Sequence, residues 1–326
     1  MVRFAAPEDF RVDEIPLFAP SGRGDHTYVR VEKTGRTTEE VVRALAQVAG
    51  VRPRDVGYAG RKDRFAVTTQ WFSVPRLDPD DIPVLALEGV RVLDASRHDH
   101  KLRTGQLAGN CFALVVRDVE PATARSAAAR LEAIAEFGVV NRFGAQRFGR
   151  DGTNAELGRR VLDGELMPRD RRRARFFVSA LQAAVFNDVL AVRRDAGRRL
   201  EAGDVAVVHE SGGLFVVEDA ALEQPRAERF EISATGPIFG TRVIAASGQP
   251  AERERKALAV RGVALERPLP RGLRLRGARR PFRVRPREVR SCVAAGSLHL
   301  GFILPAGSYA SVLVEELLGS GANGVG

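Results

Sequence analysis

The stretch GYAGRKDRFAVTTQW, residues 57–71, joins a glycine-rich basic turn to the beginning of a strand. Residues 65–74 are rich in β-branched and aromatic types and stop at Pro75, a pattern that predicts a β-strand. The turn before it holds one carboxylate, Asp63, among three cations. Positive charges close to a carboxylate keep it ionised, and an ionised aspartate can act as a nucleophile or a base on a substrate that the same charges attract.

The three cations beside Asp63 are Arg61, Lys62 and Arg64. Taken alone, these residues also fit a solvated turn with local ion pairs and no chemical role. Two glycines and the small Ala59 allow close approach of another backbone, which favours the functional interpretation only slightly.

The composition is that of a globular protein with an excess of positive charge. The chain has 326 residues, enough for two ordinary domains, of which 44% are hydrophobic and 28% charged. Lys and Arg number 51 against 41 for Asp and Glu, so the net charge of +10 favours a polyanionic partner over a basic one. Two cysteines, Cys111 and Cys292, are too few for a disulfide framework and lack the paired spacing of a zinc site.

No targeting or membrane segment is evident. The N-terminal segment reaches charged residues before an apolar signal core could form. No stretch approaches the roughly 20 apolar residues of a membrane span. We therefore expect a cytoplasmic protein that binds no membrane.

Local patterns predict interleaved helices and strands. The capping box at residues 37–40 begins a helix whose apolar face includes Val41 and Leu45. Further helices are predicted over residues 122–137, 176–194 and 309–318, and strands over residues 111–119, 205–209, 214–217 and 298–304. The strand over 111–119 is apolar enough to be buried on both faces. This order predicts an α+β fold whose middle part is an insertion.

Residues 57–71 also resemble the signature of the TruD family of tRNA pseudouridine synthases, G-x-K-D-x-x-A-x-T-x-Q-W. The matching residues are Gly60, Lys62, Asp63, Ala66, Thr68, Gln70 and Trp71. Five further blocks resemble the family in the right order, within residues 7–14, 97–112, 141–149, 179–187 and 304–310. Six ordered blocks are far more specific than any single motif.

The resemblance implies an α+β catalytic domain with a central, mainly antiparallel sheet formed from both chain ends, and an inserted α/β TRUD domain. We place the catalytic domain at residues 1–137 and 285–326 and the TRUD insertion at residues 138–284. The implied activity is that of an isomerase, an intramolecular transferase, which converts uridine 13 in the dihydrouridine arm of tRNA to pseudouridine. The resemblance implies tRNA as the partner, no cofactor or metal, and no protein partner, so we expect a monomer.

The resemblance also implies site residues. Asp63 aligns with the catalytic aspartate of the family. The residues that we assign to substrate binding are Phe10, Asn110, Phe112, Tyr309, Lys62 and Gln70. Aromatic faces stack on a base that has left its helix, and an asparagine amide can meet both a donor and an acceptor on the uracil edge. Without the resemblance, core packing would explain the aromatic residues equally well.

Arginines are the candidates for phosphate contacts. Those that we assign to RNA phosphates are Arg61, Arg64, Arg147, Arg279 and Arg280. The last two belong to the densest basic stretch, residues 271–287, which in an unrelated protein would be a solvated face. Residues 159–175 form a second strongly basic segment.

The chain departs from the family pattern at three places. Phe65 occupies a position that is usually His, Tyr309 one that is commonly Phe, and no Lys precedes the first block, although Arg3 lies one position away. These departures leave open an RNA-binding or RNA-folding protein on the same scaffold that has lost turnover. A metal-dependent nuclease is disfavoured because carboxylates do not cluster near Asp63, and the His-Asp-His run at 98–100 supplies too few ligands for a metal site.

Overall fold

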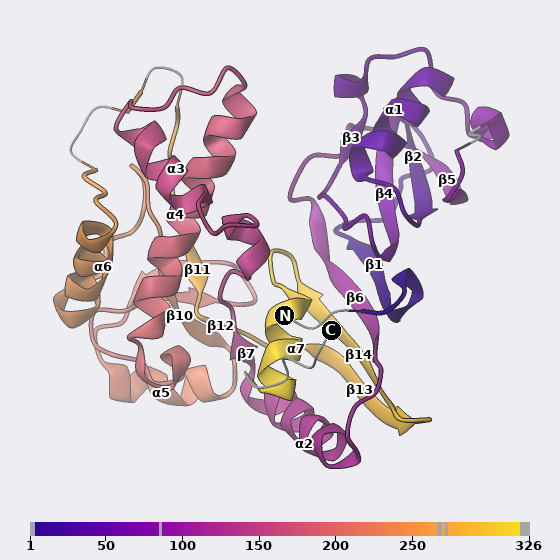
Figure 1. The fold of residues 1–326 in the computed structure, drawn as a ribbon. Coiled ribbons are helices and arrows are strands. Elements are labelled where there is room, and N and C mark those ends of the chain that lie inside the picture. The colour runs from indigo at the N-terminus through magenta and orange to yellow at the C-terminus, as the bar shows by residue number, and fades with distance from the viewer. Residues whose placement is uncertain (1–3, 85–86, 266–268, 271–272, 320–326) are drawn as a thin grey trace. The chain divides into compact units, whose positions relative to one another are not determined.

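The computed structural model describes residues 4–84, 87–265, 269–270 and 273–319 (Figure 1). The chain divides into two compact units, one formed by residues 1–135, 286–310 and 314–326 and the other by residues 136–285 and 311–313. Both chain ends thus contribute to the first unit. The assignment of the units to a catalytic and a TRUD domain, with the boundaries given above, stays a prediction.

The first unit is built on an eight-stranded sheet. Its strands are β1 (Phe10–Pro16), β2 (His26–Lys33), β3 (Gly57–Tyr58), β4 (Val67–Pro75), β5 (Val90–His98), β6 (Leu107–Val116), β13 (Arg287–Ala294) and β14 (Ser297–Pro305). Their order is β13-β14-β6-β1-β4-β2-β5, with β3 paired to β4. Only β1 and β4 run parallel, so the mainly antiparallel sheet expected for an α+β fold is confirmed.

The α-helices that lie wholly or largely among the described residues of this unit are α1 (Thr38–Val48), α2 (Pro121–Phe137) and α7 (Ala310–Leu318), of which residues 311–313 belong to the second unit. The predicted capping box is confirmed, since the Thr37 hydroxyl accepts a hydrogen bond from Glu40 N and the Glu40 carboxylate accepts one from Thr37 N. Apolar residues of α1, such as Leu45, pack on Val29 and Phe72 of the sheet. The helix therefore covers one face of β2 and β4 with an apolar core (Figure 1).

The described residues of the second unit form four α-helices and two small sheets. The helices are α3 (Asn154–Leu162), α4 (Arg171–Ala191), α5 (Ala220–Glu228) and α6 (Gly248–Val260). One sheet has the order β11 (Ala278–Pro281), β10 (Ile232–Ile238), β8 (Val205–Val208), β9 (Leu214–Val216), and β7 (Val139–Val140) pairs with β12 (Arg283–Val284). Helix α4 is long and apolar enough to span a membrane, but 61% of that apolar window is buried inside the protein, as expected of a core helix.

Two predicted elements differ from the structure. Strand β6 ends at Val116, and buried and more accessible residues alternate along its second half. The prediction that this strand is buried on both faces was wrong, because an antiparallel strand can leave one face accessible. Helix α4 begins five residues before the predicted start. The Asp170 carboxylate accepts a hydrogen bond from Arg172 N and caps the helix there, so a run of arginines forms its first turns.

Candidate active site

Helix α1 covers one face of the large sheet. On the same face, next to the N-terminal end of this helix, several polar side chains lie close together. One row across this face consists of paired residues from four strands: Lys33, Thr68, Val12 and Phe112. The next row, two residues along each strand, consists of Val31, Gln70, Glu14 and Asn110. Because residues two apart on a strand share a face, both rows point to the same side of the sheet. The loop of residues 60–65 is bound to these rows.

The first part of the loop is held through its backbone. The amide of Gln70 donates to the Gly60 carbonyl at 3.1 Å, and the Lys62 backbone N–H donates to the Thr38 hydroxyl at 3.0 Å. That hydroxyl in turn donates to the Gln70 side-chain oxygen at 2.9 Å. Both Gln70 and Thr38 are buried. The amide of Gln70 thus positions the loop, which differs from the direct substrate contact predicted from the sequence.

The Lys62 side chain adds a buried ion pair to this arrangement. Its ammonium lies 2.8 Å from the Glu14 carboxylate and donates to the Asn110 side-chain oxygen at 2.7 Å. Only 7% of the Lys62 side chain and 1% of the Glu14 side chain are exposed. The other Glu14 oxygen accepts from the Trp71 backbone N–H at 3.2 Å. Lys62 therefore binds the sheet. Sequence reasoning missed Glu14, although it lies in the first family block.

The Asp63 side chain is exposed, while its backbone is held by a hydrogen bond from a buried side chain of the sheet. Its carbonyl oxygen accepts a hydrogen bond from the Lys33 ammonium at 2.6 Å, and the next carbonyl, that of Arg64, accepts from Gly35 N at 3.1 Å. One carboxylate oxygen, Oδ1, accepts from Phe65 N at 2.9 Å. Within the part of the chain that the structure describes, no hydrogen bond engages Oδ2, so this oxygen is available to a substrate.

Three aromatic rings lie on the same sheet face as the loop contacts. The ring of Phe112 is buried, 5.4 Å from that of Phe302 and 6.3 Å from that of Phe10 between centroids. Phe10 and Asn110 are half-buried. Tyr309, also half-buried, is the N-cap residue of α7. Register thus brings Phe10, Asn110 and Phe112 together, and Phe112 contributes mainly as a buried support.

The two predicted phosphate contacts in the first unit are accessible. Arg61 is 69% exposed and pairs with Glu39 at 2.7 Å, and the exposed Arg64 donates to the Gly35 carbonyl at 3.0 Å. Exposed pairs of this kind are weak, because water and salt screen them. Both side chains lie next to Asp63 in the chain and remain candidates for phosphate contacts.

The prediction for Arg279 was wrong, because its side chain is buried, whereas that for the half-buried Arg280 stays a prediction. The guanidinium of Arg279 is only 1% exposed, is paired with Glu254 and donates to the Ile244 carbonyl. Arg280 donates to the Asn141 carbonyl at 2.9 Å and lies over the Phe143 ring at 4.2 Å. Both arginines hold the second unit together. Arg271, at the start of the same basic stretch, lies outside the described residues.

Arg147 has a largely structural environment too. It donates to the Ser179 hydroxyl at 2.6 Å and lies over the rings of Phe143 and Phe176 at 6.0 and 5.5 Å. These contacts connect the loop of residues 141–149 to α4. The carbonyl and N–H of Phe143 are both bound by the Asn187 amide, at 3.0 and 2.9 Å. The 141–149 block is therefore fixed against the core helix.

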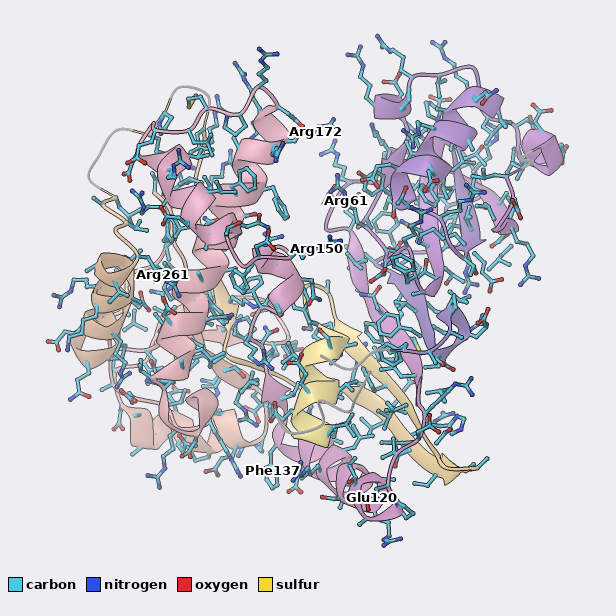
Figure 2. All side chains as sticks on the ribbon, in the orientation of Figure 1. Arg61, Glu120, Phe137, Arg150, Arg172 and Arg261 are labelled. Atoms are coloured by element: carbon cyan, nitrogen blue, oxygen red, sulfur yellow. The ribbon has the colours of Figure 1, made fainter. Side chains whose placement is uncertain are left out.

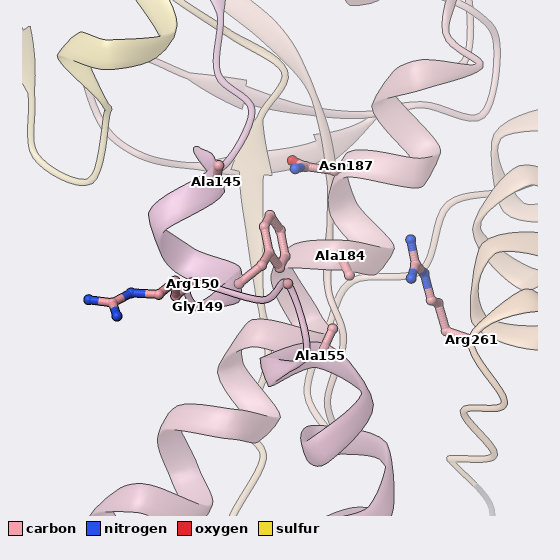
Figure 3. A pocket seen from close by; sticks show the side chains of 9 residues that line it. Ala145, Gly149, Arg150, Ala155, Ala184, Asn187 and Arg261 are labelled. Atoms are coloured by element: carbon pink, nitrogen blue, oxygen red, sulfur yellow. The ribbon is translucent and has the colours of Figure 1, made fainter. Parts of the chain in front are cut away.

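A cavity of about 490 Å³ lies beside this block, wholly within the second unit (Figure 3). Its lining includes Ala145, Gly149, Arg150, Ala184, Asn187 and Arg261. Arg261 is held by a two-point pair with Asp188, whereas Arg150 is exposed. The lining thus combines small apolar residues with the polar Asn187 and two arginines.

The basic surface that the sequence assignment missed is the beginning of α4. Its exposed arginines are Arg171, Arg172, Arg173 and Arg175. None of them forms an ion pair with another described residue, and Arg173 lies over the Phe177 ring at 5.4 Å. Figure 2 shows Arg172 at the first turn of the helix. The signal was present in the basic segment 159–175, but the predicted helix began only at residue 176, so the turns that expose these arginines were missed.

No group of three or more His, Cys, Asp or Glu residues is arranged to hold a metal ion among the residues described. The ring of His98 is buried instead among Phe18 and Tyr28, at 5.1 and 4.3 Å between centroids, and its Nδ1 accepts from Ser21 N. Its environment is that of a packed core side chain.

Comparison with known proteins shows similarity to one family over nearly the whole chain. The family model described as tRNA pseudouridine synthase D (TruD) matches residues 4–168 and 169–317. A protein named tRNA pseudouridine synthase D from Anaeromyxobacter sp. (strain Fw109-5) is 46% identical over 325 residues, covering 97% of this chain and 92% of that protein. One of the same name from Thermus thermophilus is 42% identical, covering 96% of this chain and 87% of that protein.

A solved structure shares the fold. The crystal structure titled as that of the putative tRNA pseudouridine synthase D (TruD) from Methanosarcina mazei aligns with a TM-score of 0.72 at 23% identity. The alignment covers 96% of this chain and 92% of that one.

The buried ion pair below the loop generates a stability prediction. Replacing Glu14 by Gln leaves the Lys62 ammonium without a carboxylate, so we expect the free energy of unfolding to fall by about 3 kcal/mol. The matched control is Glu39→Gln, which removes the exposed partner of Arg61 and should cost less than about 1 kcal/mol. Urea denaturation measures both. Equal losses in the two variants would contradict the assignment of Glu14 as a buried anchor of the loop.

Proposed function

Because this chain belongs to the tRNA pseudouridine synthase D (TruD) family, we propose that it is an isomerase that converts a uridine of tRNA to pseudouridine. The target that we propose is uridine 13 of the dihydrouridine arm. The observation that carries the proposal is the match of residues 4–317 to this family together with Asp63, an exposed carboxylate on a loop fixed by buried side chains.

The reaction exchanges one bond of the ribose for another and needs no net oxidation or reduction. The bond between uracil N1 and ribose C1′ breaks, a bond between uracil C5 and C1′ forms, C5 loses a proton and N1 gains one. We assign the catalytic role to Asp63, whose Oδ2 has no hydrogen bond to any described residue. As an ionised carboxylate, it acts as a nucleophile or as a base.

The detached uracil must be held while it turns. We propose that Phe10, Asn110 and Tyr309 contact the uridine and that Phe112 supports Phe10 from the core. Stacking on an aromatic face contributes roughly 1–3 kcal/mol per base and tolerates rotation of the base in its plane. Lys62 and Gln70 do not contact the uridine in this proposal; both fix the loop that carries Asp63.

Extracting a base from folded RNA costs a few kcal/mol, which contacts to phosphates offset. We propose that Arg61 and Arg64 bind phosphates beside the target nucleotide, and that the arginines at the start of α4 bind phosphates elsewhere on the tRNA. The support for α4 is that four exposed guanidiniums lack acidic partners among the described residues, so they are not neutralised within the protein.

We propose that the protein acts as a monomer, since the resemblance to the family implies no protein partner. Because the proposed substrate is tRNA, we propose that the protein acts in the cytoplasm. The alternative of an RNA-binding protein without turnover finds no support in the site, where the carboxylate expected to react is present and accessible.

Asp63→Asn is the direct test of the catalytic assignment. Asn keeps the size of the side chain and its bond from Phe65 N but cannot act as a nucleophile or base, so pseudouridine formation should fall by ~10³-fold or more while tRNA binding is retained. Chemical mapping of pseudouridine in tRNA incubated with each protein measures the product. Product from the variant at the wild-type rate would remove Asp63 from the mechanism, and an inactive wild type would favour the RNA-binding alternative.

The double variant Arg172→Ala/Arg175→Ala tests the RNA surface. Loss of two phosphate contacts should weaken tRNA binding and lower the slope of log K against log salt by about 2. Arg255→Ala/Lys256→Ala is the matched control, since it removes two exposed cations from α6 of the same unit. Filter binding at several salt concentrations measures both. A loss of the same size in the two double variants would show that α4 contributes only general charge.

A further inference from the structure

A lysine is fully buried beneath the Asp63 loop. Lys33, the last residue of β2, has 0% exposure, and its ammonium donates to the Asp63 carbonyl oxygen at 2.6 Å. The structure gives it no other hydrogen bond and no ion pair among the described residues. A buried ammonium is costly unless it is paired, and lysine is almost never fully buried. A methionine would fill a similar volume without this cost, so packing does not explain a lysine here.

Charged groups from two directions face this ammonium. The loop contributes Asp63 and Lys62, and the first turn of α1 contributes Glu39 and Glu40. The three carboxylates favour the charged form, whereas Lys62 opposes it. The neighbouring strands contribute uncharged partners in register, Thr68 from β4 and Val90 from β5. The nearest hydrogen-bond acceptor is thus the backbone of the catalytic residue itself.

We propose that Lys33 is a positioning residue for the reaction: as an ammonium it fixes the Asp63 backbone from the buried side of the loop, and loss of its proton weakens that hold and slows the reaction. This inference rests on the function proposed above. Lys33 touches neither the uridine nor the reacting atoms. It acts through Asp63, by one hydrogen bond to the carbonyl.

The pKa of Lys33 is low enough for the side chain to lose its proton within about one pH unit of physiological pH. Burial lowers the pKa of Lys33 from 10.5 to about 8, and the Asp63 charge resists this shift. Above that pH the amine is neutral, and its hydrogen bond to the Asp63 carbonyl is weaker than that of an ammonium. Pseudouridine formation should therefore decline as the pH rises through about 8.

Stability should change in the opposite direction. Between pH 8 and 10.5 the unfolded chain keeps the Lys33 proton that the folded chain has released. Because the unfolded state then binds more protons, the contribution of Lys33 to the free energy of unfolding rises with pH. If stability rises with pH while activity falls, Lys33 acts as a positioning charge. A merely structural charge would not produce opposite changes in stability and activity.

The first experiment measures the proton directly and needs no activity. The chain has four lysines, Lys33, Lys62, Lys101 and Lys256, so ¹³C labelling of the lysine ε-carbon gives few NMR signals. The signal missing from Lys33→Arg is that of Lys33. We expect it to titrate with a midpoint near pH 8. Titration above pH 10 would overturn the proposal, because Lys33 would then stay charged throughout the working range.

The second experiment compares single-turnover rates between pH 6 and 9.5. In the wild type, the decline in rate should have the same midpoint as the NMR titration. Lys33→Met should be at least tenfold slower at neutral pH with unchanged tRNA affinity and with stability at pH 7 equal to or above that of the wild type. Lys33→Arg keeps the charge, so it should recover activity and lose the alkaline decline. Lys256→Met, an exposed lysine on α6, is the control and should match the wild type.

The outcomes separate this inference from the proposed function. A wild type that forms no pseudouridine in tRNA overturns the function and, with it, the role of Lys33. An active wild type whose rate and pH profile are unchanged in Lys33→Met overturns the role of Lys33 alone. If neither variant folds, the wild type still decides: coinciding midpoints support the proposal, and midpoints more than one pH unit apart contradict it.

Discussion

The site depends on a loop whose backbone is bound to the sheet by side chains from buried strands. Asp63 leaves one oxygen accessible, yet a carboxylate in water needs a fixed backbone to stay in one place. Gln70, Thr38 and Lys33 provide that constraint through three backbone groups of the loop, and none of them uses the carboxylate. Buried groups thereby set where the aspartate lies, and one oxygen of its exposed carboxylate forms no hydrogen bond to any described residue.

The same sheet face serves two purposes along its length. Where α1 covers it, Val29 and Phe72 form an apolar core with the helix. Beyond the helix start, the side chains that face the loop change to Lys33, Thr68 and Gln70. Burying such groups opposes stability unless each finds a partner. The apolar residues under α1 and the mainly antiparallel ladder therefore stabilise the unit. The buried polar residues, such as Lys33 and Gln70, hold the loop but lower the free energy of unfolding.

The sequence was most informative where the signal is local. The capping box before α1 and the position of Asp63 in a family motif are both patterns of a few neighbouring residues. The anchors of the loop are not, because Lys33 and Glu14 meet it only through strand register. Arg279 was misjudged for the same reason: a run of basic residues suggests a solvated surface, and only the fold shows that Glu254 lies beside Arg279. The start of α4 depended on one capping aspartate within a run of arginines.

The central claim is that buried side chains fix the loop that carries Asp63, and amide hydrogen exchange at Lys62 tests it most directly. The Lys62 N–H donates to the buried Thr38 hydroxyl, although the residues on either side are exposed. We predict that this amide exchanges far more slowly than an unstructured peptide and that Thr38→Val abolishes the protection together with pseudouridine formation. Exchange of the wild-type Lys62 amide at the rate of a free peptide would contradict the account.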